Sequence, residues 1–347
     1  MARNLSCRPG SSRLLSALAL AAMLAACGGG GGDDSGPGSL ALTTANRDPV
    51  ARATVAGLYS MLSPGGLALD GTMQSSARSG PLLSRVTALA RQGLDTRRQR
   101  LDATRVAPAV VIGPEVQPCP FGGSLSLTWD DRDNSNSLTA GDTMTLVATA
   151  CRDSDVTRMD GTVTFQFTSV NNGALGAFVA RTSMSQLTLQ DGARTISMDG
   201  TVLVDYAMLS TSTERTRVSA DGSVTVTMQT PVINDTLTLS SGFWVETFSD
   251  MNAAPPESPF DPGRDTITTG GLMSSSRAGG SFSVGTTTAL TDYWVDEFPR
   301  SGVIRIEGRT GVERLTVLNS SSVRVELDAA GDGVFESADV VGWDWLI

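Results

Sequence analysis

The chain contains neither histidine nor lysine, and this double absence removes several classes of function. Among its 347 residues there is no histidine, and all 26 basic residues are arginine. Without these side chains the protein has no Ser-His-Asp or Cys-His nucleophile system, no Schiff-base or P-loop lysine and no histidine metal site. Carboxylates remain, but the 36 acidic residues are spread along the chain and no spacing singles out a catalytic pair. The sequence therefore predicts that the protein is not an enzyme.

The shortage of positive charge excludes further partners. The formal net charge is −10, whereas nucleic-acid binders need basic stripes and anionic lipid attracts basic segments. We expect no nucleic-acid partner. An acidic chain suits a solvated exterior or the binding of divalent cations.

Long apolar runs are also rare, and the clearest one lies at the N-terminus. Arg3, Arg8 and Arg13 precede an apolar run from Leu14 to Ala26. That run is too short to span a bilayer and has the length and flanks of a signal peptide. Residues 1–26 are therefore predicted to be a targeting segment.

The run ends in Leu24-Ala25-Ala26-Cys27, which resembles the lipobox of bacterial lipoproteins. The resemblance implies that residues 1–26 are removed and that Cys27 carries the lipid. Gly28 follows, where this family uses aspartate for retention at the inner membrane, so the resemblance implies the outer membrane of a Gram-negative cell. The alternative is an ordinary signal peptide cut after an Ala-x-Ala site, which leaves Cys27 as a free thiol.

Only four cysteines are present, and two of them lie in or beside the targeting segment. Cys7 leaves with the signal peptide and Cys27 is lipidated, which leaves Cys119 and Cys151. In an oxidising compartment these two are predicted to form a disulfide.

Composition divides the chain into four segments. They are a signal peptide at residues 1–26, a lipidated cysteine and Gly-rich tether at 27–47, a helical N-terminal segment at 48–112 and an antiparallel β domain at 113–347.

The helical segment contains two short amphipathic patterns. Asp48-Pro49 opens the first, which Ser63–Gly66 ends, and its apolar face is formed by Ala51, Val55, Leu58 and Leu62. The second covers about residues 79–91. Neither helix is long enough to be stable alone, so both are expected to pack on another element.

From about Gly122 onward, short runs rich in Thr, Val, Ser and Leu alternate with period two and are broken by Asp-Gly, Asn-Gly and Gly-Gly pairs. Such runs predict on the order of 14 to 18 antiparallel strands joined by tight turns. A recurring phrase is expected to open strands after turns at Asp160-Gly161, Asp199-Gly200 and Asp221-Gly222. The fold class is mainly β: a meander forming a large curled sheet, barrel-like or a sandwich, with short N-terminal helices.

The most acidic stretch of the chain joins two predicted strands. Ser124–Trp129 and Met144–Ala150 both alternate, so the residues between them form the tip of a hairpin. If Thr128 pairs near Thr143, the disulfide lies at the open end of that hairpin.

Read from Asp131, this tip resembles the twelve-residue calcium loop of EF-hand proteins. The resemblance implies these ligands: Asp131, Asp133 and Ser135 at positions 1, 3 and 5, the carbonyl of Ser137 at 7, and Asp142 at 12. Asn136 replaces the family's glycine at position 6, aspartate replaces glutamate at 12, and the flanks are strands, so the resemblance covers the loop alone.

A second loop near the C-terminus, flanked by the runs Ser322–Leu327 and Val340–Trp345, has the same pattern. Its implied ligands are Asp328, Asp332, the carbonyl of Val334, Glu336 and Asp339, with the expected Gly333 at position 6 and no ligand at Ala330. Calcium in either loop would stiffen a hairpin. The alternative is a plain polar turn, because Asp, Asn, Ser and Gly are common turn residues.

Aromatic residues are few, and the tryptophans allow two interpretations. Trp343 and Trp345 share a face of the predicted last strand, and Trp244 and Trp294 are predicted in other strands. They form either a platform for a sugar or, more commonly, part of the core.

Three functions remain open. The first is a lipid-anchored, non-enzymatic binding or structural β domain stiffened by calcium, held at the membrane through Cys27. The second is a periplasmic carrier that holds a lipid or other apolar ligand in a curled sheet. The third is a carboxylate-dependent hydrolase with two buried acids in a cleft.

Overall fold

The computed structural model describes residues 39–68, 110–135, 137–152, 154–171, 176–230, 233–255 and 263–346. These residues belong to one compact unit, Pro37–Ile347. The predictions about the signal peptide, Cys27, the tether up to residue 38 and the helix at 79–91 lie outside the described residues. The end of the predicted tether is described, and Leu40 and Leu42 donate backbone bonds to the carbonyls of Ser281 and Thr310 (both 2.9 Å).

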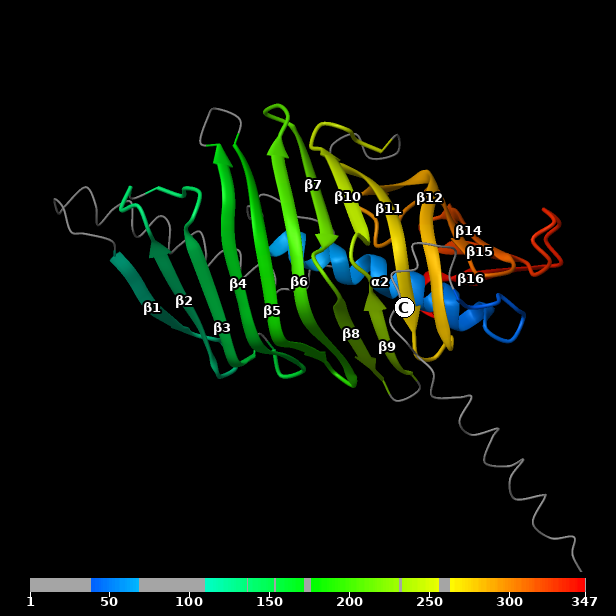
Figure 1. Ribbon diagram of the computed structural model, residues 1–347, viewed down its shortest axis with the longest axis horizontal. Coiled ribbons are helices and arrows are strands. Elements are labelled where there is room, and N and C mark those ends of the chain that lie inside the picture. Colours follow the sequence, from blue (N-terminus) through cyan, green and yellow to red (C-terminus); the bar gives the residue numbers. More distant parts are fainter. Residues whose placement is uncertain are drawn as a thin grey trace, which may run out of the picture. The chain divides into compact units, whose positions relative to one another are not determined.

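The described chain is a sheet of sixteen strands with two helices (Figure 1). The strands are β1 (Val110–Pro118), β2 (Ser124–Asp131), β3 (Thr143–Arg152), β4 (Thr157–Asn171), β5 (Ala177–Asp191), β6 (Arg194–Met208), β7 (Thr213–Ala220), β8 (Val224–Gln229), β9 (Asn234–Leu239), β10 (Trp244–Asp250), β11 (Arg264–Ser275), β12 (Gly280–Tyr293), β13 (Ser301–Glu307), β14 (Val312–Asn319), β15 (Ser322–Asp328) and β16 (Ser337–Gly342). The mainly β class and the antiparallel meander are confirmed. Because β1 begins at Val110, the end of the segment predicted to be helical, 48–112, is a strand.

The meander branches in the middle of the sheet. The upper part of β6, Val202–Met208, pairs with β7, while its lower part, Thr195–Asp199, pairs with β8. On the other side of the branch, β11 pairs with β10 through Arg264–Gly270 and with β9 through Met273–Ser275. Two short strand pairs, β7–β10 above and β8–β9 below, thus connect long strands on either side.

A line of β-bulges crosses the long strands at the level of this branch. Asp160-Gly161 and Asp199-Gly200 lie inside β4 and β6, with Gly φ values of 119° and 131°, so they do not form the predicted turns. Each aspartate accepts a hydrogen bond from a bulged residue of the neighbouring strand, Ala150 N–H to Asp160 (2.6 Å) and Gln186 N–H to Asp199 (3.1 Å). The prediction was wrong because a bulge and a hairpin turn both require glycine at positive φ. Only Asp221-Gly222 lies between two strands, β7 and β8.

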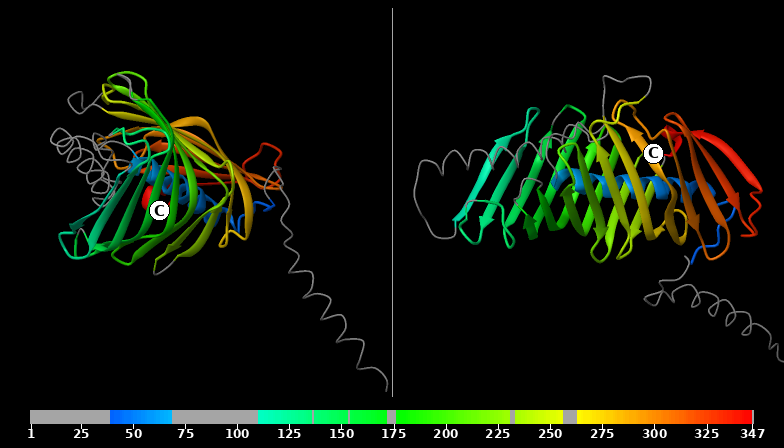
Figure 2. Two further views of the ribbon diagram at one scale, coloured as in Figure 1. Left: turned by 60° about the vertical axis from the view of Figure 1, so that its left-hand side comes forward. Right: turned by 90° about the horizontal axis from the view of Figure 1, so that it is seen from above.

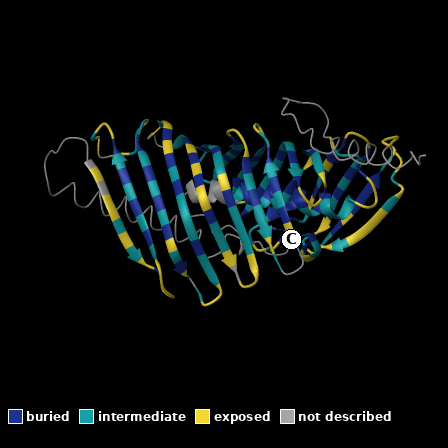
Figure 3. Ribbon diagram, turned by 60° about the horizontal axis from the view of Figure 1, so that its bottom comes forward, coloured by how far each residue is buried: buried dark blue, intermediate teal, exposed yellow. Residues whose placement is uncertain are grey.

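The two faces of the sheet differ in chemistry, as alternating exposure along the strands shows (Figure 3). The inner face carries buried apolar side chains such as Leu146, Phe165 and Val204. The outer face carries short hydroxyl side chains, and hydrogen bonds join some of them across strands, for example Thr188 with Ser197 (3.1 Å). Period-two patterning therefore assigns the faces correctly.

The helix α2 (Arg47–Ala68) packs inside the curve of the sheet (Figure 2). Asn46 precedes it, and the Asn46 carbonyl accepts the first helical bond from Val50 N–H (3.0 Å). The predicted apolar face is confirmed: Ala51, Val55 and Leu58 are at most 1% exposed, and Leu62 is half-buried against the core. The helix continues past the predicted end at Ser63–Gly66 to Ala68.

The C-terminal tryptophans do not lie on a strand. The last strand, β16, ends at Gly342, and Trp343–Leu346 form the short helix α4. Trp343 is buried and stacks on Phe298, with ring centroids 5.3 Å apart, while Arg52 of α2 lies 4.3 Å from the ring centre of Trp345. The predicted strand face was wrong because Trp fits a strand or a buried helix equally well. The described surroundings of Trp343 favour core filling over a sugar platform.

Candidate metal centre

The first acidic loop connects β2 and β3 at the upper edge of the sheet in Figure 1. Leu125, Leu127, Trp129 and Asp131 alternate onto the inner face, so Asp131 occupies a core position at the end of β2. The hairpin is confirmed, but its register differs from the predicted one: Thr128 pairs with Thr145, and Asp130 pairs with Thr143. β2 extends further into the acidic stretch than its alternating pattern of Leu and Trp indicated.

A disulfide closes the other end of this hairpin. Cys119 and Cys151 are joined, with their Cα atoms 5.4 Å apart, and both are buried. Backbone bonds continue the ladder beside it, from Arg152 N–H to the Gly122 carbonyl (2.9 Å) and from Phe121 N–H to the Arg152 carbonyl (3.1 Å). The predicted disulfide clamp at the open end of the hairpin is confirmed.

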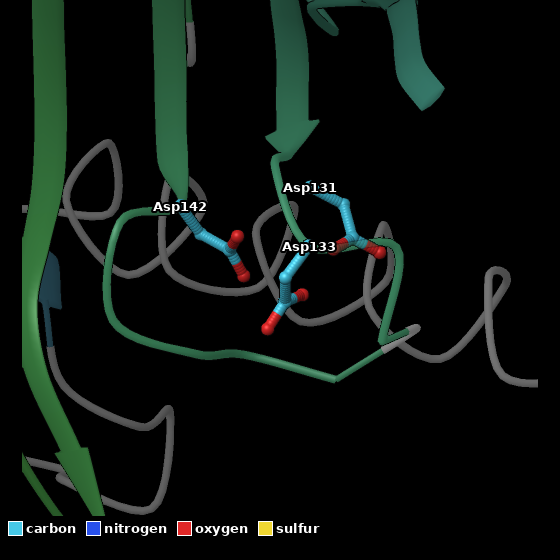
Figure 4. A group of neighbouring side chains, drawn as sticks. All are labelled: Asp131, Asp133 and Asp142. Atoms are coloured by element: carbon cyan, nitrogen blue, oxygen red, sulfur yellow. The ribbon is translucent and has the colours of Figure 1, made fainter. Parts of the chain in front are cut away.

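Three carboxylates converge at the tip of the hairpin. One oxygen each of Asp131, Asp133 and Asp142 lie within 4.8 Å of one another, and Figure 4 shows the three side chains directed toward the same space. Asp131 and Asp142 have no exposed surface, whereas Asp133 is exposed. Two buried acids beside a third need a compensating positive charge or strong hydrogen bonds.

Loop hydrogen bonds supply part of this compensation. Asp142 accepts bonds from Arg132 N–H (3.1 Å) and Thr139 N–H (2.9 Å). Asp131 and Asp133 both accept from Ser135 N–H, at 3.2 and 3.0 Å. Asp133 also accepts from the Thr139 hydroxyl (2.9 Å). Bonds to the Ser135 and Thr139 side chains lower the pKa of Asp133 to about 2, so this carboxylate is ionised at neutral pH.

The donors fit a hard cation. All three are carboxylate oxygens, which calcium and magnesium prefer, and no sulfur or imidazole takes part. Of the predicted ligands, the structure brings together Asp131, Asp133 and Asp142. Ser135 and Ser137 bind each other, because the Ser135 hydroxyl donates to the Ser137 carbonyl (3.0 Å).

The second acidic loop connects β15 and β16 and does not gather its carboxylates. Asp328 accepts bonds from three backbone amides, Gly331 (2.6 Å), Asp332 (3.2 Å) and Gly333 (2.7 Å). The other predicted ligands turn to separate partners. Glu336 accepts from Ala329 N–H, Asp332 accepts from Val334 N–H, Asp339 pairs with Arg47 at 2.6 Å, and the Val334 side chain is exposed.

The inner face also carries buried acids that the sequence did not predict, among them Glu214, Asp265 and Glu313. Burial raises the pKa of Glu214, Asp265 and Glu313, the last of them well above its ordinary value. In each case the acid alternates with apolar or small residues that face the core, as Glu313 does with Leu315 and Val317. An acid in phase with a strand's apolar face was the pattern that could have found them.

Comparisons with known proteins give no relative. No protein family, no characterised protein and no solved structure matches this chain. Within the described residues, no helix has both the length and the apolar character needed to cross a membrane.

Proposed function

We propose that this chain is a lipid-anchored protein of the cell envelope, with a binding or structural role and no catalytic activity, in which calcium stiffens the β2–β3 hairpin. One observation carries the calcium site. Asp131, Asp133 and Asp142 place their oxygens within 4.8 Å of one another, two of them fully buried.

Calcium in this loop would hold the tip of the hairpin as the disulfide holds its other end. The cation adds positive charge beside the buried Asp131 and Asp142, and neighbouring carbonyls and water complete its coordination. Such loops in extracellular proteins bind calcium with dissociation constants of about 10⁻⁴ to 10⁻³ M. The role assigned to the ion is stability of the hairpin.

The absence of histidine and lysine supports a non-enzymatic role. Burial of the inner acids supports it too, because Glu214 and Asp265 are only 3% and 8% exposed, whereas a hydrolase needs its acids in contact with substrate. The carrier function is less well supported, since α2 packs against β6, β7, β9, β10, β11 and β14 inside the curve with fully buried side chains such as Val50 and Leu58.

The calcium site is tested by comparing the thermal unfolding of the full chain in about 5 mM calcium and in excess chelator. This calcium concentration is roughly tenfold above the expected dissociation constant. We expect a higher midpoint in calcium, by several degrees, because a ligand that binds only the folded state stabilises it. In Asp142→Asn this difference disappears, while in the matched variant Asp339→Asn it persists. Equal midpoints with and without calcium would refute the calcium site.

The lipid anchor is tested separately at Cys27. In a Gram-negative host the full chain is expected in the membrane fraction, because lipidation by two or more acyl chains anchors a protein stably. Cys27→Ser is expected in the soluble fraction or with an uncleaved signal peptide. A Cys27→Ser chain that has lost its signal peptide and still remains in the membrane fraction contradicts the anchor.

A further inference from the structure

A second group of acidic side chains lies on the inner face at the same edge of the sheet as the first loop. Strand register places Glu214 of β7, Ser249 of β10 and Asp265 of β11 side by side, with Ser249 in the middle. Residues directly opposite on neighbouring strands share a face, so all three side chains point inward. Their exposed fractions are 3%, 1% and 8%.

The row is short enough for one ion to join its two acids. Neighbouring strands lie about 4.8 Å apart, so the Cα atoms of Glu214 and Asp265 are separated by roughly 10 Å across Ser249. A glutamate and an aspartate side chain are together long enough for one oxygen of each to reach a single ion over Ser249. Burial is the largest cause of the raised pKa of Glu214, and the charge of Asp265 raises it further.

One oxygen of this row has no partner. Glu214 Oε2 accepts a hydrogen bond from the Tyr206 hydroxyl (3.0 Å), but Glu214 Oε1 is buried without any hydrogen bond. Asp265 accepts from Trp294 Nε1–H (3.2 Å) and from Ser249. Within the described ranges, no arginine forms an ion pair with either carboxylate.

Another buried acid, Asp235, has hydrogen-bond donors on both of its oxygens. Asp235 is 3% exposed, and its two oxygens accept bonds from Ser275 Oγ (2.8 Å), Ser276 Oγ (2.9 Å) and Arg277 N–H (3.0 Å). Glu214 lacks such a set of donors. Asp292, 5% exposed and directly opposite Asp265 on β12, adds a third acid to the row.

We propose that Glu214, Ser249 and Asp265 form a cation site that is independent of the β2–β3 loop, with Glu214 Oε1 as the open ligand position. The donors are carboxylate and hydroxyl oxygens, so the ion is a hard divalent cation such as calcium. The ion joins β7 to β11 across β10, close to the edge of the sheet.

Terbium is the probe, because it occupies calcium sites and emits when a nearby tryptophan is excited. The full chain carries Asp131→Asn and Asp142→Asn, which removes the first loop from the measurement. We expect this variant still to bind terbium, with emission sensitised through Trp294, and calcium to displace the terbium. Adding Glu214→Gln is expected to weaken binding at least tenfold, and Trp294→Phe to reduce the emission.

Two controls keep the result interpretable. Glu313→Gln alters an equally buried acid in another part of the sheet and is expected to leave terbium binding unchanged. Ser249→Ala is a smaller change, expected to weaken binding several-fold while the circular dichroism spectrum stays that of the parent. If the loop-deficient chain binds no terbium, or binds it equally with Glu214→Gln, the site does not exist. Calcium binding at the first loop is scored separately by its loss in Asp142→Asn.

Discussion

The β2–β3 loop and the β15–β16 loop have similar acidic sequences, and both join antiparallel strands, yet their carboxylates behave differently. In the first loop, three aspartate oxygens approach within 4.8 Å. In the second, Asp328 is saturated by three backbone amides and Asp339 is drawn away by Arg47 of α2. Loop sequence alone therefore does not decide whether the carboxylates of a loop converge. The neighbours that compete for each carboxylate decide it.

Their surroundings explain the difference. Asp131 ends an inward-facing row of β2, and Asp142 immediately precedes β3, so the ladder itself brings the two acids together. The second loop instead folds over the outer face, where Arg314 bonds Glu326 (2.8 Å) and stacks on Phe335 at 4.1 Å. A closed turn results, which needs no ion.

The largest expected effect concerns the clamp that only the first loop has. Replacing Cys119 and Cys151 by serine should lower the free energy of unfolding by about 3 to 4 kcal/mol, because the unfolded chain gains the entropy of an open loop. Denaturant unfolding with and without reductant measures this. Wild type in reductant should match the variant, and a loss below about 1 kcal/mol would show that the clamp is not needed.

A substitution in the second loop should destabilise the protein to the same extent with and without calcium. Asp328→Ala leaves three amides without their acceptor and should cost about 3 kcal/mol, equally in calcium and in chelator. Denaturant unfolding in both buffers checks this. Asp332→Ala is the control, because that exposed side chain accepts only from Val334 N–H (2.9 Å) and should cost under about 1 kcal/mol. A calcium-dependent cost at Asp328 would make the two loops equivalent.

Beside the second loop, Glu313 of β14 should give the fold a pH dependence. Its carboxyl is fully buried, and neither oxygen has a hydrogen bond. Burial raises the pKa of Glu313 well above its ordinary value. The charge of Arg47 lowers this pKa, and the charge of Asp48 raises it. Because the pKa of Glu313 is higher in the folded state than the unfolded value of about 4.3, the folded protein is most stable, with respect to this group, below about pH 4.3. That stability is lost as the pH rises through the folded-state pKa.

Replacing Glu313 by leucine should therefore stabilise the protein at pH 8 by about 1 to 3 kcal/mol and have much less effect at pH 4. Denaturant unfolding across this pH range gives the comparison. A gain that is the same at both pH values would mean that Glu313 does not titrate with folding.

The smallest effect on the metal-free fold is expected at the exposed member of the first loop. Asp133→Asn should change the free energy of unfolding in chelator by less than about 1 kcal/mol, because surface substitutions rarely cost more. In calcium titrations the same variant should bind more weakly than wild type. An unchanged calcium affinity would remove Asp133 from the site.

Much of the fold follows from sequence pattern, whereas the arrangement of the acids does not. Alternation locates the strands and their inner faces, and cysteine elimination identifies the disulfide. Glycine does not distinguish a turn from a bulge, so Gly161 and Gly200 were misplaced, and the branch at β6 depends on that line of bulges. Residues distant in sequence also determine where the acidic side chains lie. Arg47 forms an ion pair with Asp339, and strand register places Glu214 and Asp265 on either side of Ser249.

Hydrogen exchange of the full chain with and without calcium tests the central claim most directly. Calcium is predicted to slow exchange in peptides covering residues 124–152 and to leave those covering 322–342 unchanged, and Asp142→Asn should abolish the slowing. Equal protection of both hairpins, or none in residues 124–152, would contradict the account.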